Sequence, residues 1–225
     1  MDLAKFLALL QTNELWFARA DTLGDPFEGS LTRPDAVTLA AAVGDNGPAN
    51  HMRRRAVSNT YVSCWHMNEG ESAAMWSLYS ASHESVCVRT TFQALASELP
   101  DWVHLSEVRY VDYGTTSLET GGLVFQLFLH KRASFAHERE LRAFFVDFFG
   151  TSEVDPSSDP HGLRLAAVKR PGGAAFKVDL NRLIDGVSIN PQAPTWFADT
   201  VRRVAEVYGL ASPVVQSELL GEALY

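Results

Sequence analysis

The chain has 225 residues, of which 46% are hydrophobic and 20% charged, a composition typical of a folded globular protein. Its formal net charge of −8 excludes bulk attraction to nucleic acid or to anionic lipid. No apolar run reaches the roughly 20 residues that a membrane-spanning helix needs, and two cysteines, Cys64 and Cys87, are too few for a disulfide framework. We therefore expect one folded domain over residues 1–225, located in the cytoplasm and without membrane contact.

The spacing of apolar residues predicts helices and strands that do not alternate regularly. Helices are expected at 3–13, on both sides of a break at 44–48 within 35–57, and at 71–80, 92–99, 123–131 and 197–208. Strands are expected at 15–20, 60–65, 85–91, 107–112, 138–149, 163–168, 175–180 and 187–189. The stretch 151–162 is rich in Pro, Ser and Asp and predicts a loop. Together these elements predict an α+β fold with a mixed or largely antiparallel sheet flanked by helices.

The segment LGDPFEG has the pattern of a helix N-terminus. Asp25 can cap the helix, Pro26 fits its first position, and Glu28 follows Asp25 by the three residues of a capping box. A helix that begins near Asp25 therefore explains this motif without any function.

Two carboxylates, Glu138 and Glu140, stand at the start of the expected strand at 138–149. In a strand, these two residues and Arg142 project from the same face. Adjacent carboxylates repel, which raises one pKa and suits that group to acid–base chemistry or to binding a cationic intermediate. A solvated strand edge, with an ion pair to Arg142, explains the same residues.

Aromatic residues gather in the expected helix at 71–80. Met75 and Tyr79 are four residues apart and share a helix face, and Trp76 lies beside them. Such a cluster can line a pocket for a flat ring, or pack the helix on a sheet. We expect Trp76 to belong to the core, so that replacing it with alanine would cost roughly 3 to 5 kcal/mol.

Metal-binding patterns are weak in this sequence. A zinc set could be drawn from Cys64, His66, His83 and Cys87, but it lacks the paired spacing of known zinc motifs. Clustered carboxylates suit magnesium, and the candidates for such a cluster are Asp21, Asp25, Glu28, Glu138 and Glu140. Helix caps and surface charges explain them as well, so we expect no metal. The basic run Arg53–Arg55 is interpreted as a solvated helix face.

The order of several motifs resembles a known family. The chain contains, in this order, LWFARADTLGDPFEG, YVSCWHMNEGESAAMWSLYS, SVCVRTTFQAL, VRYVDYG, KRASFAHERELR, VSINPQAPTWFADTVRR and VVQSEL. They resemble the prokaryotic family catalogued as domain of unknown function 2971 over nearly the whole chain. The strongest pieces are Asp25-Pro26-Phe27-Glu28, Met75-Trp76 with Tyr79, and Lys131 with Glu138, Glu140 and Arg142. This resemblance implies a relationship and no particular reaction.

A second resemblance is to ADP-ribosyltransferases that carry Arg on an early strand, Ser on a later strand and Glu-x-Glu near the end of the catalytic core. Arg19, Ser63 and Glu138-x-Glu140 occur in that chain order. The resemblance implies that NAD is the substrate and that Glu140 is the catalytic carboxylate. It further implies that Glu138 serves the acceptor side, that Arg19 contacts the dinucleotide and that Ser63 supports the site.

Three functions remain open from the sequence. An enzyme that transfers ADP-ribose from NAD or cleaves NAD needs Arg19, Ser63 and Glu140 at one cleft. A non-catalytic module that binds a small nucleotide-like ligand or a macromolecular partner through Trp76 and Tyr79 needs an aromatic cleft without converging acids. A metal-dependent phosphodiesterase needs carboxylate oxygens close enough to share an ion.

Overall fold

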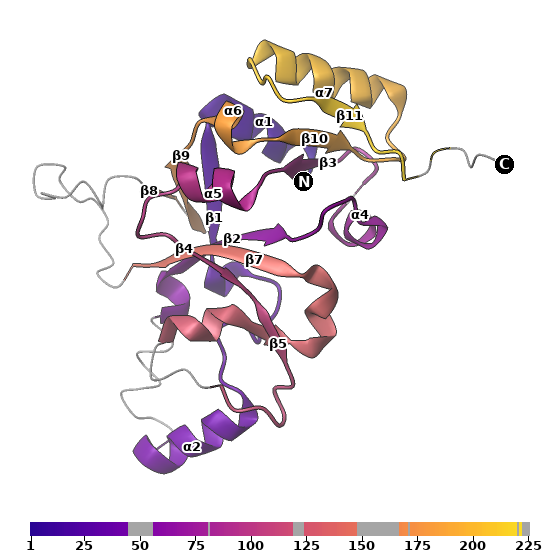
Figure 1. Cartoon of the computed structure of the whole chain (residues 1–225). Coiled ribbons are helices and arrows are strands. Elements are labelled where there is room, and N and C mark those ends of the chain that lie inside the picture. The colour runs from indigo at the N-terminus through magenta and orange to yellow at the C-terminus, as the bar shows by residue number, and fades with distance from the viewer. Residues whose placement is uncertain are drawn as a thin grey trace, which may run out of the picture. The chain divides into compact units, whose positions relative to one another are not determined.

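The computed structural model describes residues 1–44, 56–80, 82–118, 124–147, 167–170, 172–219 and 221. They form an α+β fold with mostly antiparallel strand pairing, as predicted (Figure 1). The chain divides into two compact units. Unit 1 comprises Met1–Leu15, Asn68–Pro100 and Phe176–Tyr225, and unit 2 comprises Trp16–Met67 and Asp101–Ala175. The single domain over residues 1–225 stays a prediction.

A six-stranded sheet has the strand order β4-β7-β2-β1-β9-β8. Its strands are β1 (Glu14–Arg19), β2 (Thr60–His66), β4 (His104–Glu107), β7 (Glu140–Val146), β8 (Ala167–Arg170) and β9 (Gly173–Lys177). Strand β2 pairs antiparallel with β1 on one side and with β7 on the other, and β7 pairs antiparallel with β4. The strands that carry Arg19, Ser63 and Glu140 are therefore direct neighbours.

One face of this sheet holds aromatic core residues of unit 2. In the register, Arg19 lies opposite Tyr61, and Tyr61 lies opposite Phe145. The rings of Tyr61 and Phe145 stack with their centroids 4.8 Å apart, and Phe17 packs 5.8 Å from Phe145. We call this side the aromatic face.

The opposite side of the sheet carries polar and charged groups at one end. Cys64 lies opposite Arg142, and His66 lies opposite Glu140. Because side chains alternate along a strand, these residues project away from the aromatic face. We call this side the Glu140 face, and it continues through Val62 to Ala18 on β1.

The rest of unit 2 consists of short elements next to this sheet. They are η1 (Ala20–Thr22), α2 (Arg33–Val43), the parallel pair β5 (Arg109–Val111) and β6 (His130–Arg132), η2 (Val124–Leu129) and η3 (Ala133–Glu138). Residues 56–59 are also helical. Phe128 is fully buried with Ala20 and Ala56.

Unit 1 contains a three-stranded sheet in the order β11-β10-β3 and several helices. The strands are β3 (Val86–Arg89), β10 (Gly186–Ile189) and β11 (Val214–Gln216), and the helices are α1 (Leu3–Thr12), α4 (Ala73–Tyr79), α5 (Phe92–Glu98), α6 (Leu180–Leu183) and α7 (Thr195–Val207). Helix α7 runs beside β11 (Figure 1). It buries Phe197 and Val201, and Gly209 follows with a φ of +72°, as its sequence pattern predicts.

Several expectations need correction. Residues 25–28 form turns and not a helix, residues 124–129 form a 3-10 helix, and the strand β4 was not expected. The expected strand at 138–149 begins only at Glu140. The expected loop at 151–162 and the run Arg53–Arg55 lie outside the described residues. Among the residues that are described, no helix has the length and apolar character to cross a membrane.

Candidate functional site

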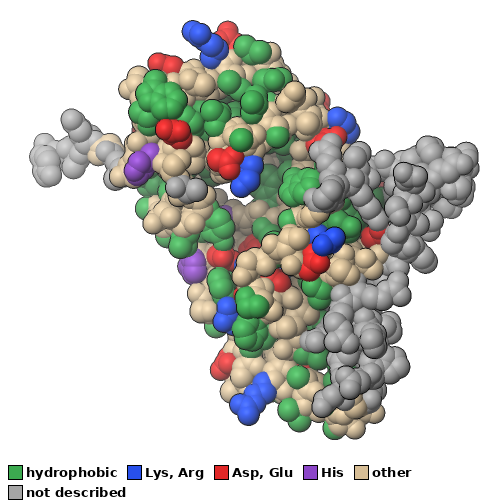
Figure 2. All heavy atoms as spheres, turned by 180° about the vertical axis from the view of Figure 1, so that it is seen from behind, with side chains coloured by type: hydrophobic (Ala, Val, Ile, Leu, Met, Phe, Trp, Pro, Cys, Tyr) green, Lys and Arg blue, Asp and Glu red, His purple; other side chains and the backbone are tan. Residues whose placement is uncertain are grey.

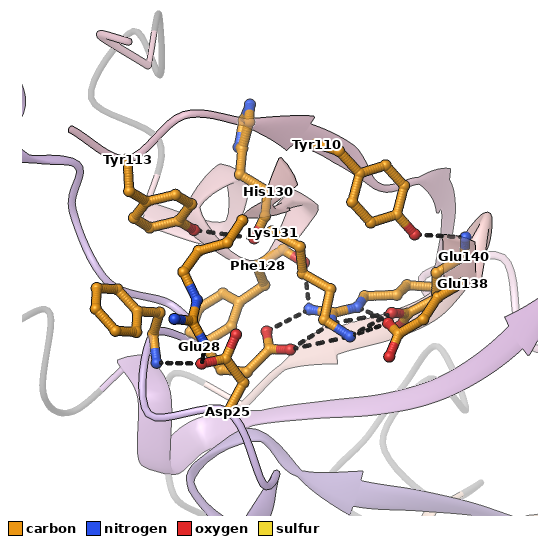
Figure 3. A network of polar contacts seen from close by, with 12 residues as sticks. Asp25, Glu28, Tyr110, Tyr113, Phe128, His130, Lys131, Glu138 and Glu140 are labelled. Carbon is orange, nitrogen blue, oxygen red and sulfur yellow. Dashed lines mark hydrogen bonds and ion pairs between the residues drawn. The ribbon is translucent and has the colours of Figure 1, made fainter. Parts of the chain in front are cut away.

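A buried ionic cluster occupies the Glu140 face in unit 2 (Figure 3). We define it by five residues whose side chains are at most 10% exposed, namely Glu28, Lys131, Glu138, Glu140 and Arg142. They come from the DPFEG turns, β6, the end of η3 and β7. Burying charges is costly unless they are paired and hydrogen-bonded, so the geometry of the pairing decides what this cluster can do.

Arg142 is the centre of the cluster and is completely buried. Its two terminal nitrogens donate to the two carboxylate oxygens of Glu28 at 2.8 and 2.7 Å, and its Nε donates to Oε1 of Glu140 at 2.6 Å. Nη1 also donates to the carbonyl oxygen of Phe128 at 2.7 Å. The planar guanidinium thus fixes Glu28 by a two-pronged contact and orients Glu140 at the same time.

Lys131 is the second cation of the cluster. Its Nζ donates to Oε2 of Glu138 and, at 3.0 Å, to Oε2 of Glu140, and it lies 3.7 Å from Oε1 of Glu28. Glu138 ends η3, and Arg139 then adopts a left-handed conformation with a φ of +40° before β7 begins. This backbone turn, and not strand alternation, brings Glu138 and Glu140 to the same ammonium group.

The ionic contacts hold Glu140 and Lys131 in their charged forms. Burial alone would raise the pKa of Glu140, but the charge and hydrogen bonds of Arg142, together with Lys131, lower it below the usual value. Burial opposes the charge of Lys131 as well, yet Glu140 and Glu138 raise its pKa. Three carboxylates face two cations, so the cluster carries one excess negative charge when all five groups are ionised.

The DPFEG segment serves this cluster, and its interpretation as a helix cap was wrong. Oδ1 of Asp25 accepts from the backbone N–H of Phe27 at 3.0 Å and from Arg132 at 3.0 Å. The Glu28 carboxylate turns toward Arg142 and away from the local backbone. Gly29 has a φ of +64°, and a Cβ at this position would lie 2.5 Å from the Phe128 ring. Only glycine fits that turn.

Cys64 and His66 lie next to the cluster on the same face of β2. Cys64 is exposed to solvent. The pKa of its thiol is nevertheless raised, mainly because protein atoms surround the sulfur and also because of the negative charge of Glu140, to which the thiol is hydrogen-bonded. Nδ1 of His66 contacts the carbonyl oxygen of Glu138 at 2.6 Å and must donate the proton there. Cys64 therefore marks the solvent-accessible side of Glu140.

The structure does not bring Arg19 and Ser63 to Glu140. Ser63 lies opposite Ala143 and only 8% of it is exposed, so it projects from the aromatic face together with Arg19. Arg19 also lies about five residues, or roughly 17 Å, along the sheet from the position of Glu140. Its Nε is 2.6 Å from Oδ1 of Asp21, which matches the surface ion pair that a strand-end arginine commonly makes.

Trp76 and Tyr79 lie on α4 in unit 1, and the expectation that Trp76 is a core residue was wrong. No residue of α4 is buried, and Tyr79 is 56% exposed. The indole Nε1 of Trp76 donates to Oε2 of Glu71 at 3.1 Å, and the same oxygen accepts from the hydroxyl of Ser217. The hydrogen bonds of Glu71 with Trp76 and Ser217 therefore anchor α4, and part of its apolar surface is exposed to solvent.

A metal centre finds no support among the described residues. Within the parts of the chain that the structure describes, no group of three or more His, Cys, Asp or Glu side chains is arranged to hold a metal ion. The carboxylates that could have served a phosphodiesterase, Glu28, Glu138 and Glu140, already bind Lys131 and Arg142. The cations of this site are the protein's own side chains.

Comparison with family models, with curated proteins and with solved structures finds no significant match for this chain. Both resemblances seen in the sequence therefore stay hypotheses. Sequence reasoning placed Glu138, Glu140 and Arg142 on one strand face. It grouped Lys131 with them only through the family resemblance and Glu28 with the two glutamates only as a candidate magnesium set, and it did not predict the ion pairs of Lys131 and Glu28 in this cluster. Lys131 begins the segment KRASFAHERELR, which also contains Glu138, Glu140 and Arg142, and this closeness in sequence was the available signal.

Proposed function

We propose that the Glu140 face of the six-stranded sheet binds a small ligand, and that the reaction it suits best is cleavage of the N-glycosidic bond of NAD, with water or another acceptor taking the ADP-ribose. The observation that carries this proposal is the fixed, ionised carboxylate of Glu140 within a cluster that has excess negative charge. Such a preorganised charge stabilises positive charge that develops in a transition state.

The reaction would develop that charge on the ribose. The bond between C1′ and the pyridinium nitrogen breaks, the bonding electron pair leaves with neutral nicotinamide, and the ribose becomes an oxocarbenium ion. Water or an acceptor hydroxyl then adds to C1′ and loses a proton. Glu140 would stabilise the cation, and Glu138, beside the same Lys131, would face the acceptor. In this proposal a ligand would approach Glu140 past Cys64, which is exposed and lies beside Glu140 on the same face of the sheet.

The strand order supports this proposal only in part. The strands of Arg19, Ser63 and Glu140 are direct neighbours in the sheet. Their register turns Arg19 and Ser63 to the opposite face. The proposal therefore depends on Glu140, and Arg19 becomes a suitable control position.

The test is NAD consumption with release of nicotinamide by the purified chain. Replacing Glu140 with glutamine keeps the shape and removes the charge, so turnover should fall by about 10²- to 10³-fold. Replacing Arg19 with lysine should leave turnover unchanged, because Arg19 lies on the other face. Thermal melting of each variant shows that it is folded. No NAD consumption by the unmodified chain, or equal consumption by the folded Glu140→Gln variant, would refute the proposal.

A second candidate function is binding without catalysis through α4. It rests on the exposure of the apolar side chains of Leu78 and Tyr79, which are 58% and 56% exposed, on a helix that buries no residue. Calorimetric titration with NAD separates the two candidates. If binding is lost in Tyr79→Ala and kept in Glu140→Gln, the ligand site is on α4. The reverse result assigns it to the Glu140 face.

A further inference from the structure

An exposed tryptophan lies on the Glu140 face, at a position that neither resemblance assigns. Trp16 is on β1, is 42% exposed and belongs to unit 2. Its neighbour Phe17 is fully buried on the aromatic face, so Trp16 projects from the other side of the sheet. β1 pairs with β2 at Ala18–Val62 and Arg19–Tyr61, and Trp16 precedes this pairing by two residues on the same side of the sheet as Ala18.

The indole of Trp16 is seated on a glycine of β9. A Cβ on Gly173 would lie 2.2 Å from Cζ2 of Trp16, a distance that no side chain allows. The missing side chain lets the ring approach the backbone of the neighbouring strand. The ring is thereby supported from below while 42% of the residue remains accessible. A supported ring with an accessible surface is what a stacking site for a planar ligand requires.

The position of Trp16 relative to Glu140 limits what it can bind. Strand β2 lies between β1 and β7, so two inter-strand spacings separate β1 from β7. Arg142 lies opposite Cys64, and Glu140 lies two residues from Arg142 along β7. With standard sheet dimensions the backbone positions of Trp16 and Glu140 are at least about 12 Å apart. A base attached directly to a ribose that reacts at Glu140 would be too close to Glu140 to reach Trp16. The second base of a dinucleotide would be at a suitable distance.

We propose that Trp16, seated on Gly173, is the stacking platform for the adenine ring of a dinucleotide whose other ribose lies at Glu140. This inference rests on the proposed function for the identity of the ligand, and it adds the residue that would make the site prefer a dinucleotide over a mononucleotide. The recognition is by the flat face of the base, since the indole offers a planar surface and Gly173 offers no side chain.

Binding of AMP and ADP-ribose tests the platform without any turnover. Calorimetric titration of the whole chain should show that both compounds bind, and that nicotinamide mononucleotide binds more weakly than NAD. Replacing Trp16 with leucine should weaken the binding of AMP and of ADP-ribose by about 5- to 150-fold, which is the range for losing one base–aromatic stack. Trp16→Phe should retain part of the affinity. Trp196→Leu is the matched control, because Trp196 is 57% exposed but lies on α7 in unit 1.

The outcomes separate this inference from the proposed function. If AMP binds through Trp16 and NAD is not consumed, the platform stands and the proposed reaction fails. If NAD is consumed and Trp16→Leu leaves its KM unchanged, the platform is refuted and the reaction stands. A rise in KM with unchanged kcat in Trp16→Leu supports both. Absence of AMP and ADP-ribose binding by the unmodified chain refutes the platform.

Discussion

Replacing Arg142 with methionine tests the importance of the buried ionic cluster. Among the contacts of the described residues, Arg142 is the only charged group within hydrogen-bond distance of Glu28, and the substitution removes it. It also removes the N–H group that donates to Oε1 of Glu140. Three carboxylates would then share Lys131 alone. Breaking a buried charge pair in this way costs about 3 to 5 kcal/mol, a large part of the roughly 5 to 15 kcal/mol by which most domains are stable.

Urea unfolding at neutral pH measures this cost, with Arg202→Met as the matched control. Arg202 pairs with Asp199 on α7 at 3.1 Å, but its side chain is 45% exposed. That surface pair should contribute at most about 1 kcal/mol. A free energy of unfolding for Arg142→Met within about 1 kcal/mol of that of the unmodified chain would refute the reasoning. Losing an essential buried ion pair should lower the free energy of unfolding by more than losing a surface pair does.

The dependence on pH gives a second check of the same variant. The pKa of Glu140 is lowered in the folded chain, so its ionisation contributes stability above the ordinary value of 4.5, and this contribution is lost as the pH falls through the folded pKa. Once Glu140 is protonated, it no longer needs the charge of Arg142. The difference between Arg142→Met and the unmodified chain should therefore shrink in acid. A difference that stays constant below pH 4.5 would mean that packing, and not charge, explains the effect.

Two further substitutions test local features. Trp76→Ala should lower the free energy of unfolding in urea by less than about 2 kcal/mol, because α4 buries no residue. Leu95→Ala is the control and should lower it by about 2 to 5 kcal/mol, because Leu95 is fully buried. Equal losses would mean that Trp76 is a core residue after all. Gly29→Ala should cost more than about 1 kcal/mol, because of its φ of +64° and the Phe128 ring 2.5 Å from the new Cβ. Gly24→Ala is its control, since a Cβ there has open space, and a similar cost at both positions would contradict the close approach at Gly29.

Local patterns predicted the elements whose stabilising contacts are local. The spacing of Phe197 and Val201 and the position of Gly209 place α7 correctly, because a helix with one buried stripe shows its period directly in the sequence. The first helix has the same kind of pattern, and α1 ends at Thr12 as expected. Helix α4 misled us, since its apolar composition is typical of a core helix while its attachment through Glu71 is polar.

The ionic cluster could be predicted only in part, because its contacts join distant segments. Asp25 and Glu28 satisfy every local rule for a capping box, but Arg142 competes for the Glu28 carboxylate and is not visible in that window. The pairing of Glu138 and Glu140 was expected from strand alternation. The structure achieves it through the left-handed Arg139, a conformation that the residue type alone does not predict.

The contact between Glu28 and Arg142 also constrains the order in which the chain can fold. The two residues are 114 positions apart, so closing this loop carries a high entropic cost before the contact forms. Arg142 reaches Glu140 within β7 itself, but it reaches Glu28 only when the DPFEG turns have come to lie against β7. Until then, Arg142 and the carboxylates remain hydrated, and burying them together is a late step. Unit 2 should therefore fold slowly for its size, as expected for a structure dominated by long-range strand pairing.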